Sequence, residues 1–296
     1  MTSPETYPVP NLVVFVRHGQ SEANVIQQRD KLFVKYMEAG DEDAAAALPE
    51  IPEALRERPD WEHRLTDKGI AQAQAAGAWL LENMGDVSTV FQGRYHSLFV
   101  RARETASYLS SPDCLWRPHN MIHERDWGQY GMTPRSEQEA RFPHTYRMKK
   151  ASPLYARLDG GEAIGDNVAL RVRSFRETTK RKFAGKNVIA VTHGDVFTTA
   201  RFVYERMLPE EVAEMESDPT QRIGNCALMA YASFNPNDPT EKLPYFGWRL
   251  MIQPDDLASS PFNGEWQQLP DKRFMSGSEL QASVEQFPRL IPGLSL

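Results

Sequence analysis

The sequence predicts an α/β sandwich with helices on both faces of a mostly parallel sheet. Two short valine-rich segments, residues 12–16 and 187–192, lack polar–apolar alternation, as expected of strands covered on both faces. Segments with helical spacing separate the candidate strands, which is typical of right-handed β-α-β crossovers. Each valine-rich segment ends near a histidine–glycine pair. In such sheets ligands bind at the carboxyl ends of strands, so both pairs are expected there.

The first half of the chain is expected to begin with one strand and an insertion. Residues 12–16 form the strand, and the pattern becomes irregular after the VRHGQSEAN corner that follows it. Residues 35–60 are acidic and alanine-rich with three prolines, which indicates an insertion with short helical pieces. Because the insertion follows the corner directly, we expect residues 27–60 to cap the pocket.

Two helices and two short strands are predicted next. In residues 64–85 Thr66 can cap a helix whose apolar residues keep approximate helical spacing. Residues 96–112 form a second helix, which Pro112 would end. The strand candidates are residues 88–91 and 113–116, and the segment HNMIHERDWGQYGMTP after them is irregular.

The second half is expected to repeat the strand–helix theme and to close with a hairpin. Residues 160–185 indicate a glycine-led loop and then a long helix, whose basic face we interpret as a solvated surface. Asp195 can cap the helix that follows the second valine-rich strand. Residues 226–233 and 245–253 form the closing hairpin. The tail from residue 254 offers only turn residues and scattered hydrophobics.

The composition suits a globular protein with a substantial core. Its 296 residues are 41% hydrophobic, enough for one large domain or two small ones. We expect a single domain over residues 1–296, with an insertion at about 27–60 and a C-terminal extension from about residue 254.

Charge and cysteine content narrow the function classes. A net charge of −6 argues against a general nucleic-acid binder, which needs a basic surface. Cys114 and Cys226 form no CxxC spacing or disulfide framework, which suits a reducing compartment. No signal peptide is evident, and no run approaches the roughly 18 apolar residues of a membrane span. We expect a cytoplasmic protein with a small-molecule substrate, and a homo-oligomer stays open.

The two histidine–glycine corners suit phosphoryl transfer. A neutral imidazole at His18 can attack phosphorus, while the Arg17 guanidinium grips two oxygens and Gly19 allows close backbone approach. His193, followed by Gly194, would clamp the same group if the two strands are neighbours. The alternatives are that Arg17 leaves the sheet for solvent, that His18 packs locally and that His193 is a core histidine.

Two further segments carry candidate groups. Arg101 and Arg103 lie on opposite sides of a helix, so at most one would face a site, and helix propensity alone favours a surface role for Arg101. Glu124 lies in an aromatic, glycine-punctuated loop, where a desolvated carboxyl would stay protonated and act as a general acid. The alternative is a carboxylate paired with Arg125.

Six segments in order resemble the histidine phosphatase superfamily, the phosphoglycerate-mutase-like proteins, and particularly branch 1. The resemblance spans roughly Leu12 to Ile252, and the segments are VRHGQSEAN, LTDKGIAQA, SLFVRARETA, HERDWGQY, GGEAIGDN and VTHGD. It implies a three-layer α/β/α fold with a phosphorylated His18. Arg17, Arg101 and His193 would hold the phosphoryl group, and Glu124 would be proton donor and then base. Further residues implied by their place in these motifs are Gly19, Gln20, Asn24, Arg125 and Gly194, with Glu162 in support.

The resemblance implies a phosphatase that needs no metal and no cofactor. A phosphoglycerate mutase is the nearest alternative. In mutases a tryptophan–asparagine pair follows the first motif and a lysine-bearing segment follows the fourth. Here Ala23 precedes Asn24, and the later segment reads MTPRSEQEARF. A non-catalytic phosphate-binding protein of the same fold is another alternative.

A metallohydrolase built on His18, His123, Glu124 and His193 is disfavoured, because no HxxxH or HxH pair supports compact ligation.

Overall fold

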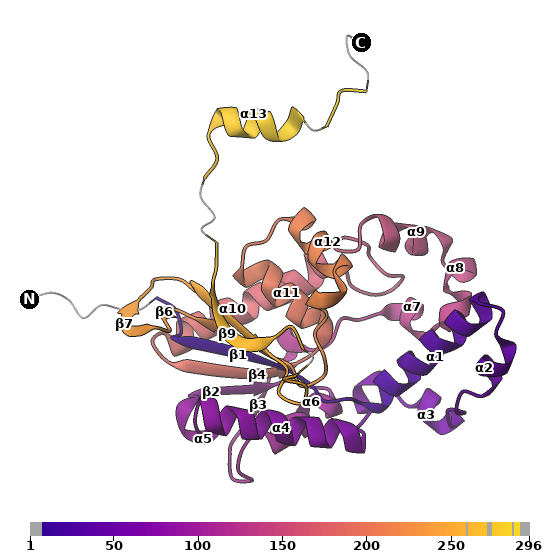
Figure 1. Ribbon diagram of the computed structural model, residues 1–296, viewed down its shortest axis with the longest axis horizontal. Coiled ribbons are helices and arrows are strands. Elements are labelled where there is room, and N and C mark those ends of the chain that lie inside the picture. Colours follow the sequence, from indigo (N-terminus) through magenta and orange to yellow (C-terminus); the bar gives the residue numbers. More distant parts are fainter. Residues whose placement is uncertain (1–7, 259, 271–273, 286, 291–296) are drawn as a thin grey trace, which may run out of the picture.

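The computed structural model describes residues 8–258, 260–270, 274–285 and 287–290, and its centre is a seven-stranded mixed sheet (Figure 1). The strand order is β3-β2-β4-β1-β5-β8-β9. These strands are β1 (Leu12–Arg17), β2 (Gly93–His96), β3 (Arg117–Pro118), β4 (Asn187–Thr192), β5 (Leu228–Ala232), β8 (Trp248–Ile252) and β9 (Asn263–Gln268).

The register of β1 places the two histidine corners side by side. β1 pairs in parallel with β4, and Arg17 lies opposite Thr192, so His18 and His193 leave the sheet together. On its other side β1 pairs with β5 in antiparallel. Parallel pairing is therefore confined to the half formed by β3, β2, β4 and β1. The remaining strands are antiparallel, so the sheet is mixed rather than mostly parallel.

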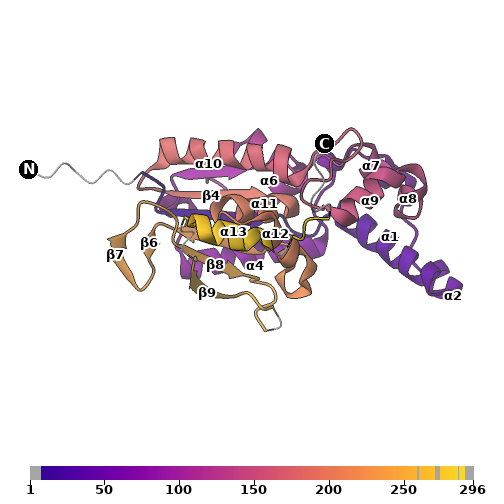
Figure 2. The same cartoon turned by 90° about the horizontal axis from the view of Figure 1, so that it is seen from above.

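Helices cover both faces of the sheet, as predicted. The helices are α1 (Glu22–Glu38), α2 (Glu42–Ala46), α3 (Glu53–Glu57), α4 (Asp67–Asn83), α5 (Val87–Val90), α6 (Val100–Tyr108), α7 (Gly128–Met132), α8 (Gln138–Arg141), α9 (Pro143–Ala151), α10 (Ala169–Phe183), α11 (Gly194–Tyr204), α12 (Pro209–Ser217) and α13 (Gly277–Glu285). Helices α10 and α11 lie on one face of the sheet and α4 and α6 on the other (Figure 1, Figure 2). Helices α1, α2 and α7–α9 lie beyond the end of the sheet where β1 terminates.

The core divides at β1, whose alternate residues point to opposite faces. Val13 and Phe15 pack in a cluster with residues of α10 and α11. Val14 and Val16 pack in a second cluster with residues of α4 and α6. The uninterrupted apolar run predicted to be buried on both faces is therefore confirmed, and it forms the middle of three layers.

Both short strand predictions in the first half were wrong. Residues 88–91 fall largely in helix α5, because the Asp86 carboxylate caps the turn by accepting the Ser88 N–H at 2.6 Å. The strand comes later, as β2. Helix α6 consequently starts at Val100 rather than at His96. The strand predicted at residues 113–116 is displaced to Arg117–Pro118.

Two other predictions also differ from the structure. The irregular segment after VRHGQSEAN begins with helix α1, since Ser21 and Asn24 form a capping box. Asp195 lies in the first turn of α11, and its N-cap is His193.

The closing segments hold more strands than predicted. The connector of the closing hairpin contains strands β6 (Phe234–Asn235) and β7 (Asp238–Lys242), which pair with each other. The tail supplies β9, which pairs with β8 at the edge of the sheet. Across the described ranges, no helix is both long enough and apolar enough to cross a bilayer.

Candidate active site

The two imidazoles meet at the carboxyl ends of β1 and β4. The ring centroids of His18 and His193 lie 5.1 Å apart, and the residues are 2% and 0% exposed. The Asn225 side-chain amide donates to the His18 carbonyl at 3.0 Å, which ties the corner to the loop before β5. Two histidines 175 positions apart therefore share one buried site. This was expected from the sequence if the two strands were neighbours, and β1 and β4 are paired.

Hydrogen bonds orient each ring. His18 Nδ1 lies 2.7 Å from the Gly19 carbonyl oxygen. A carbonyl only accepts, so Nδ1 carries the proton and Nε2 keeps its lone pair. His193 Nε2 lies 2.7 Å from Ser97 Oγ, which already accepts the Phe99 N–H. The Ser97 hydroxyl can therefore donate to Nε2, and in that tautomer the His193 proton is on Nδ1.

Burial keeps both imidazoles neutral. Burial is the largest cause that holds the pKa of His18 and of His193 well below 6.5, and the charge of Arg101 is the next cause for both. Arg17 adds to the same effect. A neutral ring is the form in which a histidine can act as a nucleophile.

Arg17 and Arg101 flank the histidines. Arg17 Nη1 donates to the Ile223 carbonyl, and Gly194 lies against the Arg17 guanidinium. The Arg101 side chain is 4% exposed, whereas Arg103 is exposed, so the structure turns Arg101 inward. Arg101 donates to Asp60 through both terminal nitrogens, at 2.6 Å to the carbonyl and 3.1 Å to each carboxylate oxygen.

Glu124 lies beside His193 with a raised pKa. Its Oε2 is 3.8 Å from His193 Nδ1, and its side chain is 15% exposed. Burial, followed by the nearby Asp195 carboxyl, raises the pKa of Glu124 to about 7, and Arg101 opposes the rise. A large fraction of Glu124 is therefore protonated near neutral pH.

Arg125 lies behind Glu124 rather than in an ion pair with it. Its backbone N–H donates to Glu124 Oε1 at 2.9 Å. Its guanidinium instead donates to the carbonyls of Glu162 and Ala156, at 2.9 and 3.0 Å, and lies 3.9 Å from Asp195.

Gln20 and Asn24 are engaged within the protein. Gln20 Oε1 accepts from the Thr66 hydroxyl at 2.9 Å. Asn24 Oδ1 accepts from the Ser21 N–H and from the Asn225 amide, both at 3.1 Å. Both side chains thus hold the backbone that follows His18.

Gly19 and Glu162 also position the surrounding backbone. A Cβ on Gly19 would lie 2.3 Å from the Gly69 carbonyl oxygen, so only glycine fits. Glu162 accepts from the Asp126 N–H at 3.0 Å and from Arg171 at 2.7 Å, and so supports the loop that carries Glu124.

Three contacts of the site were not foreseen from the sequence. Ser97 opens the SLFVRARETA segment, so its place in that motif was an available signal. Asn225 and Asp60 belong to no quoted motif. Only the fold brings them to His18 and Arg101.

His18, Glu124 and His193 also form a group that could hold a metal ion. Their ligand atoms lie within 4.8 Å of one another, although the sequence spacing had disfavoured compact ligation. The three residues are distant in sequence, so the fold assembles them. His123 is not part of this group, since its Nδ1 bonds the Glu124 carbonyl at 2.6 Å. The positive charges of Arg17 and Arg101 beside the group oppose a divalent cation and favour an anion.

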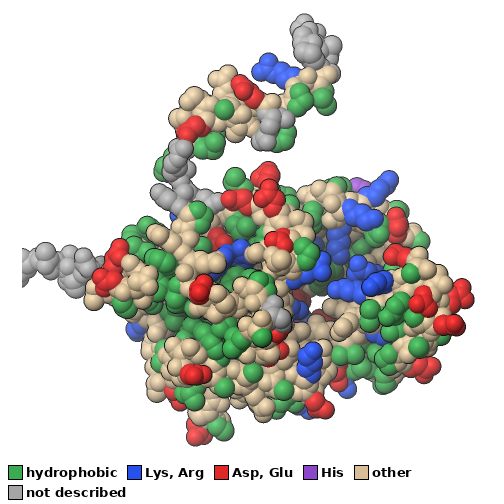
Figure 3. All heavy atoms as spheres, in the orientation of Figure 1, with side chains coloured by type: hydrophobic (Ala, Val, Ile, Leu, Met, Phe, Trp, Pro, Cys, Tyr) green, Lys and Arg blue, Asp and Glu red, His purple; other side chains and the backbone are tan. Residues whose placement is uncertain are grey.

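Cationic side chains gather around a hollow between α12 and the helices α1 and α9 (Figure 3). Burial, then Arg125 and Arg135, lowers the pKa of Lys149 to about 8. Burial, then Arg135 and Arg222, lowers the pKa of Lys31. Arg135 contributes to both shifts and Lys31 to that of Lys149, so positive charge is concentrated here. Such a concentration favours anions at this surface despite the net charge of −6.

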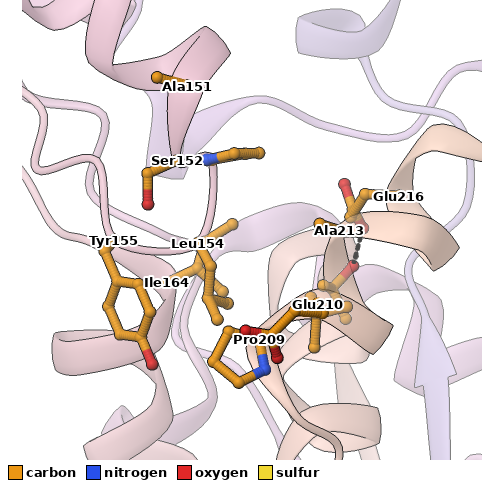
Figure 4. Close-up of a pocket in the computed structure, with 12 residues that line it drawn as sticks. Ala151, Ser152, Leu154, Tyr155, Ile164, Pro209, Glu210, Ala213 and Glu216 are labelled. Carbon is orange, nitrogen blue, oxygen red and sulfur yellow. Dashed lines mark hydrogen bonds between the residues drawn. The ribbon is translucent and has the colours of Figure 1, made fainter. Parts of the chain in front are cut away.

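A separate pocket of about 200 Å³ lies between the segment after α9 and helix α12 (Figure 4). Leu154, Tyr155 and Pro209 form part of its apolar wall. Glu216, also in its lining, accepts from the Thr198 hydroxyl at 2.8 Å. Its lining contains none of the groups around His18.

Comparisons with known proteins show the family and the fold of the chain. The model of the histidine phosphatase superfamily (branch 1) matches residues 53–229, more than half of the chain. The match begins after Arg17 and His18, so the roles of these two residues rest on the geometry. A 2,3-bisphosphoglycerate-dependent phosphoglycerate mutase 2 of Gloeobacter violaceus is 26% identical over 211 residues, covering 69% of this chain and 80% of that protein.

Solved structures show the same fold at low sequence identity. The alpha-ribazole phosphatase from Shigella flexneri has a TM-score of 0.54 at 18% identity, covering 79% of this chain and 95% of that chain. A mycobacterial glucosyl-3-phosphoglycerate phosphatase in complex with inorganic phosphate has a TM-score of 0.53 at 17% identity, covering 75% and 89%.

Proposed function

The chain belongs to branch 1 of the histidine phosphatase superfamily, and from that premise we propose that it is a metal-independent phosphatase. It hydrolyses a small phosphomonoester through a phosphohistidine intermediate at His18. Its acid and base are one residue, Glu124. Positive charge from Arg17 and Arg101 takes the place that a metal ion has in other phosphoryl-transfer enzymes.

The observation that carries the proposal is a set of buried nitrogen atoms around His18. Arg17 Nε, Arg101 Nε and His193 Nδ1 are buried and have no hydrogen-bond partner among the described residues. An unsatisfied buried donor costs about 1–3 kcal/mol, so three of them near one ring call for an anionic acceptor. The oxygens of a phosphoryl group would accept from all three.

In the first step, the lone pair on His18 Nε2 forms a bond to phosphorus while the bond from phosphorus to the ester oxygen breaks. Protonated Glu124 gives its proton to the leaving oxygen. The arginines and His193 Nδ1–H stabilise the charge on the phosphoryl oxygens.

In the second step, the Glu124 carboxylate takes a proton from water as the water oxygen bonds to phosphorus. The bond between His18 and phosphorus breaks, which restores the neutral ring. Glu124 is again protonated, and inorganic phosphate leaves.

Hydrolysis is favoured over mutase chemistry by two departures from the mutase pattern. Ala23 stands before Asn24 where mutases have tryptophan, and residues 132–142 replace the lysine-bearing segment. The two solved structures described above are named as phosphatases, which is in keeping with this choice.

Phosphoglycerate mutase activity is the second candidate, and two observations favour it. The curated relative described above carries that name. The cations Lys31, Arg135 and Lys149 lie near one another and could bind a second acidic group of a phosphorylated substrate.

The test is a screen of phosphorylated metabolites with the wild type and His18→Ala, with and without EDTA. We expect phosphate release by the wild type only, unaffected by EDTA. Equal turnover by both proteins would reject His18 as nucleophile, and loss of activity in EDTA would favour the metal alternative.

The same samples separate phosphatase from mutase. Conversion of 3-phosphoglycerate to 2-phosphoglycerate is measured with a 2,3-bisphosphoglycerate primer, beside phosphate release. A mutase rate that exceeds hydrolysis of every phosphomonoester in the screen contradicts the proposal.

A further inference from the structure

Arg101 is held almost entirely by one acidic residue. A guanidinium has five N–H donors. Nη1 uses both of its donors on the carbonyl and Oδ1 of Asp60, and Nη2 uses one on Oδ2. Three donors therefore end on a single residue, which lies in the short turn η1 (Asp60–Glu62) at the end of the predicted insertion.

The two remaining donors of Arg101 share one edge of the guanidinium. They are Nε–H and the second N–H of Nη2, which point the same way and can hold two oxygens of one anion. Nε is buried, and no described residue accepts from it. The flat face is covered by Phe99, whose ring centroid lies 4.8 Å from Cζ. Asp60 thus binds the terminal nitrogens of the Arg101 guanidinium and Phe99 covers its face, while its Nε–Nη2 edge stays open.

The edge that Asp60 leaves open belongs to the site. After burial, the charge of Arg101 is the largest influence on the pKa of His18 and of His193. The Asp60 carboxylate itself is outside the buried pocket, with 54% of its side chain exposed. Asp60 therefore binds the guanidinium from the solvent side and does not occupy the place of the phosphoryl group.

We propose that Asp60 is a positioning residue, which holds Arg101 so that its Nε–Nη2 edge faces the phosphoryl group. The inference rests on the proposed function for the identity of the anion. It links the insertion to the chemistry, because the residue that aims Arg101 lies where the insertion ends.

The test compares Asp60→Ala and Asp60→Asn with Glu62→Gln. Glu62 is the matched control, because it is exposed in the same turn and its change also removes one negative charge. Removing a negative charge near an anion site by itself strengthens anion binding. Loss of positioning predicts the opposite sign, which makes the direction of the effect diagnostic.

The first readout is the affinity for inorganic phosphate, measured by calorimetry. We expect both Asp60 variants to bind phosphate about 10-fold more weakly. Without Asp60 the Arg101 guanidinium is no longer oriented to donate to two oxygens of the same phosphate. We expect Glu62→Gln to bind phosphate as tightly as the wild type or slightly more tightly, because only a negative charge is removed. Unchanged or tighter binding by folded Asp60→Ala and Asp60→Asn, with circular dichroism as the folding check, would overturn the proposal.

The second readout tests whether Asp60 acts through Arg101. In an Arg101→Ala background, adding Asp60→Ala should change phosphate affinity by less than about 2-fold. A further loss of about 10-fold there would assign Asp60 another role and overturn the inference.

The phosphate-affinity measurements also separate the inference about Asp60 from the proposed phosphatase function. If the wild type binds phosphate but hydrolyses no phosphomonoester, the proposed function fails while the Asp60 result still stands.

Discussion

At the scale of single residues, Glu124 governs both halves of the proposed reaction. Its carboxyl must be protonated to release the leaving group and ionised to activate water. Burial and the neighbouring Asp195 raise its pKa to about 7, so both forms are accessible near neutral pH. Its pKa is raised, so the proton is present below about pH 7 and lost above it.

Glu124→Gln should uncouple the two chemical steps. Glutamine keeps the shape but neither gives nor takes a proton. With 4-nitrophenyl phosphate, whose leaving group needs no proton, we expect a burst of nitrophenol and accumulation of phosphohistidine. With an alkyl phosphate the first step itself should slow by about 10²–10⁴-fold.

The burst is measured by stopped-flow absorbance and the phosphoenzyme by mass spectrometry at alkaline pH. His18→Ala is the control and should show neither. Equal losses on the two substrates, without phosphoenzyme, would exclude Glu124 as the acid.

The pH dependence of the wild type gives an independent check. On an alkyl phosphate under single-turnover conditions, the phosphorylation rate should fall about tenfold per pH unit well above pH 7, because protonated Glu124 is lost. On 4-nitrophenyl phosphate the same step should be nearly flat over that range. A common decline on both substrates would point to another titrating group.

At the scale of elements, the start of α4 is packed against the backbone that carries His18. A Cβ on Gly69 would lie 2.0 Å from the Gln20 carbonyl oxygen. The glycine of the LTDKG segment is therefore required by close approach of two backbones. This contact explains why that segment belongs with the site although it supplies no reacting group.

Gly69→Ala should lower both stability and activity. An added methyl group must displace the Gln20 backbone, which costs about 1–3 kcal/mol of unfolding free energy and moves the His18 corner. Gly77→Ala is the matched control on the same helix, because its Cβ would instead lie 2.5 Å from the Tyr108 carbonyl oxygen.

Both glycine variants should lose stability in urea titrations, while at a temperature where both are folded only Gly69→Ala should lose kcat. Full kcat in Gly69→Ala would contradict this reading of the contact.

The insertion is the other element with a predicted role. Helix α1 carries Glu22 and Asp30, which pair with Arg58 at 2.8 Å and Arg56 at 3.1 Å. These ion pairs fasten the end of the insertion to α1. We expect this part of the chain to select substrates, as the prediction of a cap over the pocket implies.

Replacing residues 41–57 by a glycine–serine linker of equal length should change substrate preference more than folding. The linker keeps α1 and Asp60 and removes α2 and α3. The ranking of phosphomonoesters by kcat/KM is measured for both proteins, with thermal unfolding as the folding check. An unchanged ranking would count against a cap.

At the scale of the whole molecule, the buried imidazoles make stability depend on pH. The pKa values of His18 and His193 lie well below 6.5 in the folded state. Their contribution to stability is therefore complete above about pH 6.5 and is lost as the pH falls below it. In that range the two imidazoles bind protons in the unfolded chain but stay neutral in the folded chain.

We expect the free energy of unfolding to fall between pH 6.5 and 5, and to fall less steeply in His18→Asn. Urea titrations at several pH values in phosphate-free buffer measure both slopes, since bound phosphate would add stability of its own. Equal slopes in the two proteins would mean that His18 is not held neutral by the fold.

The sequence predicted the two strands at the centre of the sheet and the residues at their ends. Valine-rich runs without alternation are buried on both faces, and that pattern is local. The strand prediction failed at residues 88–91. There the Asp86 carboxylate caps a helical turn in an apolar stretch and stabilises it. The sequence pattern also gave no sign of β9, because an edge strand with one partner needs no distinctive composition.

The sequence by itself determined the motif residues, the glycine corners and the local charge of a site for phosphoryl transfer. The family resemblance had already selected Arg101 rather than Arg103, which helix spacing alone could not do. Only the tertiary structure decided that Asp60 holds Arg101 and that the Arg125 guanidinium turns away from Glu124. The physical reason is that these choices depend on contacts between segments far apart in the chain. Burial and the charges that shift a pKa arise only where such segments meet.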